Sequence, residues 1–390
     1  MKVVCDRSAL LDAINLISGV VASRTPRPQL TCVRLTAEPL DSAGLLTLAG
    51  TDAEIALTLR TERVEVEQPG GALVPADKLA QIVRAEDNEP TLTLEADDDL
   101  LHIRGADAHF QLRGFPTADF VDIPSYDSVV RVSGGARSFT ARAGALAEAV
   151  RRTLFAAAKE NSRYAINGVL MKRDGKKLEF VSTDGRRLAL SRTTLESEEG
   201  EPVAPIVPAK ALTLLGKLLD DPNEPVGVAV SDQQIAFAVG LEPGADEPTA
   251  RAVLCSNLIE AAFPPYEDVI PKDQSIKVGF DREILASAVR RAALLTNEES
   301  RGVRMAFSGQ GRTLELSSRV PEMGEAKIDV EVASYEGDDI EIGFNPSYIV
   351  DGLKVIDKPE VTVEMKASGK PGLFRSGNDF LYVVMPVTLQ

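Results

Sequence analysis

Few side chains in this sequence stand in patterns that could carry out catalysis. The acidic cluster "EADDD", which ends at Asp97–Asp99, offers the neighbouring carboxylates that a hydrolase or a divalent metal site would need. This cluster falls at the turn between two alternating segments, where solvated acidic side chains are expected. The motifs GxGxxG, GxxxxGKS/T, HExxH and GxSxG are absent. We therefore predict no catalytic residue, and a carboxylate-dependent hydrolase is the less favoured alternative.

Residue types that bind metals are also sparse. The two histidines, His102 and His109, lie in or beside strand-like segments without a partner motif. Cys5, Cys32 and Cys255 are odd in number, scattered and without a CxxC pair, which fits a reducing cytosol and argues against a disulfide framework or a zinc site. We predict no metal and no cofactor.

The formal net charge of −16, taken alone, argues against a nucleic-acid partner. The charge is, however, unevenly distributed along the chain. Basic residues lie mainly in segments with helical periodicity, whereas acidic residues gather in turns such as Glu196–Glu201 and Glu336–Asp339. The pairs Arg151-Arg152 and Arg290-Arg291 occupy equivalent places in two such segments. One face of the molecule is therefore expected to be basic, although for any single residue a solvated helix face is the alternative.

The helices that would position these residues occur as a repeat. The segments "ALLDAINLIS", "ALAEAVRRTL" and "ILASAVRRAA" place small or apolar residues at i, i+3 and i+4, which predicts amphipathic helices. Three later segments, "LVPADKLAQIV", "IVPAKALTLLGKLL" and "FNPSYIVDGLKVI", begin with Pro75, Pro208 and Pro346, where a first helical turn tolerates a missing N–H.

Alternating segments between and after the helices predict antiparallel strands, and each repeat closes with a strand that ends in Phe115-Pro116, Phe263-Pro264 or Met385-Pro386. A chain of 390 residues suits two to three domains. We predict an α+β fold of three repeated domains, each with two helices and antiparallel sheets. The predicted domains are residues 1–126, 127–273 and 274–390, with linkers near Tyr126–Ala136 and Pro271–Ser275.

No segment of the sequence suggests a membrane protein. The first residues carry charges inside their apolar stretch, and no later stretch is long enough to span a bilayer. We predict a cytoplasmic protein without a membrane partner.

Over its whole length the sequence resembles the bacterial DNA polymerase III beta subunit, the sliding-clamp family. The segments that carry the resemblance are "SGVVASR", "RYAINGVL", "TDGRRLA", "FPPYEDVIP", "SRGVRM", "IGFNPSY" and "YVVMP", found in this order within the threefold repeat. The resemblance implies a ring-shaped, head-to-tail homodimer of clamp domains that encircles duplex DNA, slides without sequence specificity and acts as a processivity factor. The implied partners are DNA, a replicative polymerase, a clamp loader and other proteins with a clamp-binding motif of the Gln-Leu-x-Leu-Phe type.

The resemblance also implies three sets of site residues. The DNA contacts are Arg24, Lys78, Arg84, Arg151, Arg152, Lys159, Lys210, Lys217, Arg290, Arg291 and Arg301. The partner-peptide groove is lined by Ile166, Thr183, Gly185, Arg187, Leu188, Pro264, Val269, Tyr348, Val383, Val384, Met385 and Pro386. The subunit boundary contains Phe110, Leu112, Leu294 and Leu295.

The sequence departs from familiar members of the family at the rim of that groove. Asp268 stands where a basic residue is common, and Val387 and Thr388 replace a methionine and an arginine. A repeat scaffold that binds proteins without encircling DNA is the alternative of a different class.

Overall fold

The computed structural model describes residues 1–22, 24–40, 43–159, 166–242, 249–296 and 302–388. The chain divides into two compact units. One unit comprises Met1–Ala147 with Glu196–Leu258, and the other comprises Glu148–Leu195 with Ile259–Gln390.

The first unit is built on two antiparallel sheets. In the smaller sheet the strand order is β5 (Val64–Gln68), β1 (Lys2–Asp6), β7 (Thr91–Asp97), β8 (Leu100–Arg104) and β9 (His109–Arg113). In the larger sheet it is β10 (Ser138–Arg142), β15 (Pro225–Val230), β16 (Gln234–Val239), β17 (Ala252–Asn257), β4 (Ile55–Thr61), β3 (Ala43–Thr51), β2 (Cys32–Leu40) and β6 (Gly70–Pro75). The larger sheet crosses the predicted repeats, because β17 pairs with β4.

The second unit also has two antiparallel sheets. One contains, in order, β11 (Gly168–Asp174), β12 (Lys177–Thr183), β13 (Arg187–Thr194), β26 (Phe380–Val384), β25 (Gly372–Ser376), β24 (Glu360–Met365), β18 (Ile276–Asp281) and β22 (Ser334–Glu336). The other contains β21 (Gly324–Glu331), β20 (Thr313–Val320), β19 (Val303–Ser308) and β23 (Ile340–Phe344). Here β13 pairs with β26, so strands from two predicted repeats again share a sheet. The three-repeat boundaries therefore stay a prediction.

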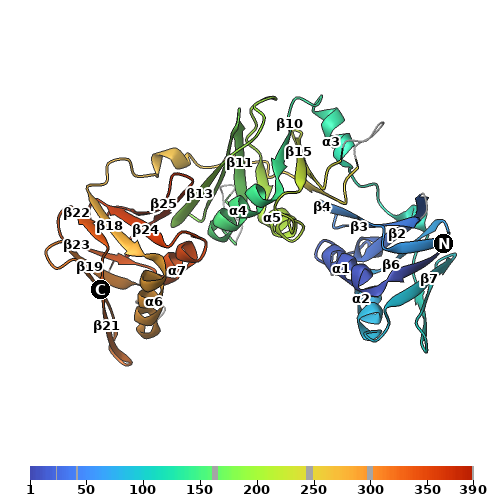
Figure 1. The fold of residues 1–390 in the computed structure, drawn as a ribbon, viewed down its shortest axis with the longest axis horizontal. Coiled ribbons are helices and arrows are strands. Elements are labelled where there is room, and N and C mark those ends of the chain that lie inside the picture. Colours follow the sequence, from blue (N-terminus) through green and yellow to red (C-terminus); the bar gives the residue numbers. More distant parts are fainter. Residues whose placement is uncertain (23, 41–42, 160–165, 243–248, 297–301, 389–390) are drawn as a thin grey trace. The chain divides into compact units, whose positions relative to one another are not determined.

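The six predicted helices are all present. They are α1 (Arg7–Ser18), α2 (Ala76–Ala85), α4 (Ala143–Thr153), α5 (Ala209–Gly216), α6 (Arg282–Ala292) and α7 (Pro346–Lys354). The starts of α1, α6 and α7 are each capped by a side chain. The carboxylates of Asp6 and Asp281 accept a hydrogen bond from a backbone N–H in the first turn of α1 and α6, and the side-chain oxygen of Asn345 does so for α7. Helices α1 and α2 pack as a pair in the first unit, and α6 and α7 pack as a pair in the second (Figure 1).

One predicted linker contains a helix that the sequence analysis did not predict. Residues Tyr126–Val132 form a seventh helix, α3, within the stretch where we predicted a linker. Ser125 and Ser128 form a capping box that fixes its first turn. Val129 is buried against β15 and β16, and burial raises the pKa of Tyr126 to about 12. The sequence reading missed this helix because its seven residues are too few to show a helical period.

Two features that bear on chemistry agree with the sequence analysis, the place of the acidic cluster and the unpaired state of the cysteines. Asp97 ends β7 and Leu100 begins β8, so the acidic cluster lies at a turn. Cys5, Cys32 and Cys255 are free thiols buried in the core. Burial raises the pKa of both Cys5 and Cys255 to about 12, so these thiols are protonated at neutral pH.

Candidate functional site

The turn between β12 and β13 is held by its own side chains. Gly185 has φ of +83°, a conformation that suits glycine, and this confirms the predicted hairpin turn at Asp184-Gly185. The Asp184 carboxylate accepts hydrogen bonds from the backbone N–H groups of Arg186 and Arg187 at 2.9 and 3.0 Å. Thr183 Oγ1 donates to the carbonyl of Arg187 at 2.7 Å and accepts from the N–H of Gly185. The turn therefore presents Arg187 in one fixed position.

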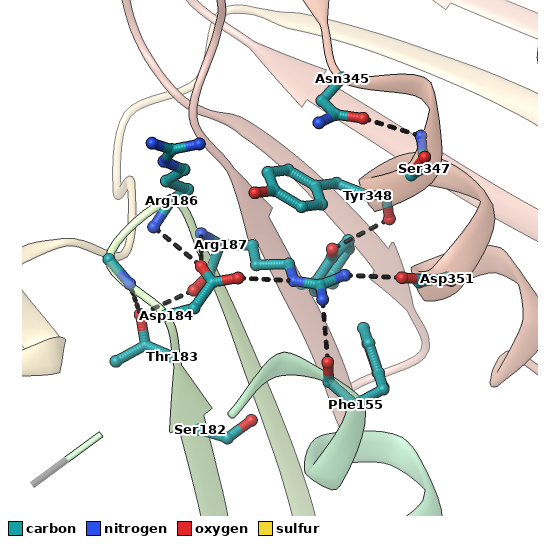
Figure 2. A network of polar contacts seen from close by, with 12 residues as sticks. Phe155, Ser182, Thr183, Asp184, Arg186, Arg187, Asn345, Ser347, Tyr348 and Asp351 are labelled. Carbon is teal, nitrogen blue, oxygen red and sulfur yellow. Dashed lines mark hydrogen bonds and ion pairs between the residues drawn. The ribbon is translucent and has the colours of Figure 1, made fainter. Parts of the chain in front are cut away.

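Arg187 joins this turn to helix α7 (Figure 2). Its guanidinium donates to Asp184 at 3.0 Å and to Asp351 of α7 at 2.8 Å. A third hydrogen bond reaches the carbonyl of Phe155 at 2.9 Å, in the 3-10 helix η3 (Leu154–Ala156). The guanidinium also lies 4.5 Å from the ring centroid of Tyr348, close enough for a cation–π contact. Arg187 thus connects three segments that are separated in the sequence: its own turn, η3 and α7.

Burial and hydrogen bonding shift the pKa values of two side chains in the Arg187 network. The Arg187 side chain is only 9% exposed. Burial alone would lower the pKa of Arg187, but its hydrogen bond to Asp351 and the nearby Tyr382 raise that pKa above its ordinary value. Burial raises the pKa of Tyr382, whose hydroxyl donates to the carbonyl of Tyr348 at 2.9 Å. Both side chains therefore hold one charge state at any physiological pH.

Replacing Arg187 by alanine is expected to destabilise this unit. The change leaves Asp351 and the Phe155 carbonyl without their donor, although Asp351 is partly solvated at 36% exposure, so we expect a loss of about 2–3 kcal/mol. Denaturant unfolding followed by circular dichroism measures this loss. The matched control is Arg186→Ala, at the neighbouring exposed position, for which we expect a change below about 0.5 kcal/mol. Equal effects of the two substitutions would contradict a supporting role for Arg187.

The strand β26 lies beside this turn. It pairs with β13 in the register Arg187↔Val384 and Leu188↔Val383. Beyond the strand, the N–H of Met385 donates to the carbonyl of Arg186 at 2.9 Å, and the N–H of Val387 donates to the carbonyl of Gly343 at 2.9 Å. On the other side, a Cβ on Gly352 of α7 would lie 2.4 Å from the Tyr382 ring, so this helix packs closely on β26. The sheet thus holds the segment in place, as the sequence indicated.

Three of the predicted groove residues are buried. Val383 and Val384 are 1% and 0% exposed, and Leu188 is 2% exposed. The neighbours β13 and β25 occupy the two edges of the strand, and other parts of the unit cover both faces, since Val384 belongs to its hydrophobic core and Val383 is equally buried. These three predicted groove residues therefore lie beneath the surface, and a peptide could not touch their side chains in this conformation.

The exposed apolar groups of the predicted groove lie around that buried layer. Met385 is 39% exposed, and Tyr348 and Pro386 are half-buried. Ile166 is buried, and its carbonyl accepts from the N–H of Ala158, just after η3. Met385, Tyr348 and Pro386 are therefore the members most accessible to a peptide.

Two of the predicted groove residues lie on a separate segment. Pro264 and Val269 flank the 3-10 helix η4 (Tyr266–Asp268), and Val269 is 45% exposed. An ion pair between Lys172 of β11 and Glu267 holds η4 against the sheet. Among the described contacts, these two residues are not part of the Arg187 network.

Most of the predicted DNA contacts are exposed basic side chains. The exposed ones are Arg24, Lys78, Arg84, Arg151, Lys159, Lys210, Lys217, Arg290 and Arg291. Some already have protein partners: Arg84 donates to Asn15 at 2.9 Å, Arg151 pairs with Asp357, and Lys210 pairs with Asp52. Arg301 lies outside the described residues.

Arg152 is a correction to the predicted DNA contacts. It is 3% exposed, and its guanidinium pairs with Asp379 at 2.7 Å and with Glu148 at 2.6 Å. Burial alone would raise the pKa of Asp379, but the hydrogen bond from Arg152 brings that pKa below its ordinary value. Arg152 therefore ties α4 to the β25–β26 turn and cannot offer its charge to a phosphate, so the prediction for this residue is wrong.

The predicted subunit-boundary residues lie at sheet and helix ends. Phe110 and Leu112 are half-buried on β9, the last strand of its sheet. Leu294 is 74% exposed and Leu295 is half-buried, both in the 3-10 helix η5 (Ala293–Leu295) that follows α6. Leu294 in particular exposes apolar surface that nothing in the described chain covers.

The sequence reading missed Asp351, Phe155 and Asp379 as partners of the two buried arginines. Asp351 stands in α7 six residues after Asn345, on a helix whose charge pattern alone gives no reason to single it out. No sequence signal connects these residues to their partners, because the contacts join segments more than thirty positions apart, up to 227 for Arg152 and Asp379.

The described residues show neither a metal-binding cluster of three or more side chains nor a membrane-spanning helix. Within the described ranges, no group of three or more His, Cys, Asp or Glu side chains is placed to hold a metal ion. Among those same residues, none of the helices has the length and apolar character needed to cross a membrane.

Comparison with known proteins places this chain in one family. Three family models match in order: the DNA polymerase III beta subunit N-terminal domain over residues 1–124, the central domain over 141–265 and the C-terminal domain over 267–388. Curated relatives include the beta sliding clamps of Pseudomonas putida, 33% identical, and Escherichia coli, 30% identical; each alignment covers 100% of both chains.

Solved structures give the same result. The DNA polymerase III subunit beta of Pseudomonas aeruginosa superimposes with a TM-score of 0.86 at 32% identity, over 100% of both chains. The DNA polymerase sliding clamp of Bacillus subtilis does so with a TM-score of 0.87 at 26% identity, over 100% of both chains. A sliding clamp from Pseudomonas aeruginosa bound to griselimycin matches with a TM-score of 0.87 at 31% identity, also over 100% of both chains.

Proposed function

The chain belongs to the DNA polymerase III beta subunit family, the bacterial sliding clamps, and on that premise we propose that it acts in the cytoplasm as a ring-shaped homodimer. In this proposal the ring encircles duplex DNA and moves along it without reading sequence. It tethers a replicative polymerase and other proteins through a peptide-binding surface. The protein is a clamp and not an enzyme.

The proposal that the protein binds DNA is supported by basic side chains that lie exposed on helices. In the first unit Lys78 and Arg84 lie exposed on α2, and in the second unit Arg290 and Arg291 lie exposed on α6. Arginine and lysine contacts to phosphates position a protein on a duplex but carry no sequence information. Such binding weakens steeply with salt and permits sliding. The overall charge of −16 disfavours DNA elsewhere on the surface.

Two sets of apolar residues, one on the edge strand β9 and one on η5, support the proposed dimer. Phe110 and Leu112 lie on the edge strand β9, which leaves one row of backbone hydrogen-bonding groups open. Leu294 and Leu295 lie on η5 in the other unit. A contact between β9 of one subunit and the η5 region of its partner, repeated by twofold symmetry, closes a ring without free ends.

The proposed partner surface consists of Met385, Pro386 and Tyr348 above the buried layer of β26. Apolar side chains beside a rigid turn suit a short extended peptide with leucine and phenylalanine anchors. Asp268 places a negative charge near Val269 on the η4 segment. Partners with acidic residues flanking their motif are therefore expected to bind less well than partners with basic ones.

Retention on circular DNA tests the encircling function. The protein is loaded onto a nicked circular plasmid with a clamp loader and ATP, and the complex is passed through a sizing column at high salt. We expect the protein to stay with the circle, because a closed ring can leave only by opening, and to be lost when the plasmid is linearised before the column. A double Arg290→Ala, Arg291→Ala variant should load less efficiently but, once loaded, should still be retained.

Two outcomes of this experiment would contradict the proposal. Release from the intact circle by salt would mean ordinary electrostatic binding. Equal recovery with no DNA at all would favour a protein-binding scaffold that does not encircle DNA.

A further inference from the structure

The chain's two histidines meet in space, although nothing in the clamp function requires it. Nδ1 of His102 lies 3.0 Å from Nε2 of His109, and the two rings stack with centroids 5.2 Å apart. His102 is on β8 and His109 on β9, so the pair bridges the last two strands of the smaller sheet in the first unit.

The strand register places both rings on one face of that sheet. His102 lies opposite Gln111, and His109 lies opposite Arg104, so the histidines are diagonal neighbours across the strand pair. The opposite face carries the core residues Leu101 and Ile103. The turn between the strands is closed by a hydrogen bond from Gly105 N–H to the carbonyl of Ala108 at 3.0 Å. The two rings are therefore held side by side at the surface before any ligand arrives.

The separation of the two nitrogens suits a metal chelate. A metal–nitrogen bond to imidazole is about 2.0–2.1 Å long. At that length, nitrogens 3.0 Å apart subtend an angle of roughly 90° at the ion. This angle is typical of the tetragonal sites of Cu²⁺ and Ni²⁺ and is narrower than the tetrahedral angle that Zn²⁺ prefers.

The charged groups around the pair are nearly balanced. Glu95 of β7 lies opposite His102 on the same face and pairs with Arg104 at 3.2 Å. Lys2 of β1 lies opposite Glu95 and pairs with Glu67 of β5. Arg104 and Lys2 thus each have an acidic partner, and Glu95 is the cross-strand neighbour of His102. Arg113, two residues from Gln111 on the same face, adds one positive charge.

We propose that His102 and His109 form a two-histidine site for one divalent transition-metal ion of the Cu²⁺ or Ni²⁺ class, with water completing the coordination. In the metal-free protein the two nitrogens share a hydrogen bond, in which one donates and the other accepts. When the ion binds, the ring that donated this hydrogen bond carries its proton on its other nitrogen instead, so both imidazoles act as neutral ligands and no net proton is released. This site does not depend on the proposed clamp function.

Calorimetric titration of the full-length protein with Ni²⁺, after removal of metals by a chelator, tests the site. We expect one ion per chain. His102→Gln and His109→Gln should each weaken binding at least tenfold, and the double variant should be no weaker than either single one, because each single change already destroys the chelate. The matched control is Gln111→Ala, which alters the exposed neighbour opposite His102 and should leave the affinity unchanged.

Nitrogen-15 spectra identify the atoms, since a chain with two histidines gives only two imidazole patterns. With diamagnetic Zn²⁺ as the probe, the signals of His102 Nδ1 and His109 Nε2 should shift together at one equivalent. Two ions per chain would mean two independent imidazoles, and unchanged Ni²⁺ affinity in either glutamine variant would place the ion elsewhere. Either result overturns the proposal.

Discussion

Deleting Met385–Gln390 is expected to abolish binding of a peptide of the Gln-Leu-x-Leu-Phe type while leaving the protein folded. The deletion removes Met385 and Pro386, two of the most accessible apolar residues of the proposed partner surface. It leaves β26 intact, because the strand ends at Val384 and its residues are held by pairing with β13 and β25. Only two described backbone hydrogen bonds are lost, from the N–H groups of Met385 and Val387. Fluorescence anisotropy with a labelled peptide measures the affinity.

A reciprocal control separates this surface from the DNA-binding face. Arg290→Ala, on the exposed side of α6, should keep full peptide affinity while weakening association with DNA. The truncated protein should behave in the opposite way and should still be retained on circular DNA. Undiminished peptide affinity in a truncated protein of normal size would show that the segment after β26 is only the end of a strand.

Replacing both Leu294 and Leu295 by alanine is expected to convert the dimer to monomers. Truncating a leucine that is fully buried in an interface costs about 2–5 kcal/mol. Loss of two per interface should raise the dimer dissociation constant by at least about a thousandfold, since about 1.4 kcal/mol corresponds to a factor of ten. Light scattering across a dilution series measures this shift. The subunit itself should stay folded, because Leu294 is 74% exposed and its truncation opens no cavity within the chain.

The matched control for this pair is Ile284→Ala. Ile284 lies in the first turn of α6, the helix that precedes η5, and is 56% exposed, so its truncation removes a similar exposed apolar surface at the far end of that helix. We expect it to leave the dimer intact. A double leucine variant that stays dimeric at nanomolar concentration would mean that η5 is not part of the subunit boundary.

Local patterns in the sequence determined much of the fold. Apolar spacing found six of the helices, and the Asp184-Gly185 pair found the turn that presents Arg187, because helices and tight turns depend on neighbours within a few residues. The ordered motifs and the threefold repeat were sufficient to identify the family. The same patterns found most of the exposed basic residues, since charged side chains on a helix surface are exposed by default.

Only the tertiary structure decided which of the predicted site residues are exposed to a ligand and which are buried. Arg152 and Arg291 stand at equivalent places in two repeats, yet Arg291 is exposed and Arg152 is buried against Asp379, 227 positions away. Val383 and Val384 follow the alternation of an ordinary strand, yet both are buried because other parts of the unit pack on both faces of β26. The two histidines lie seven residues apart with no motif between them, and the β8–β9 register brings their nitrogens to 3.0 Å. In each case the deciding contact comes from strand order and packing between distant segments, which local patterns do not encode.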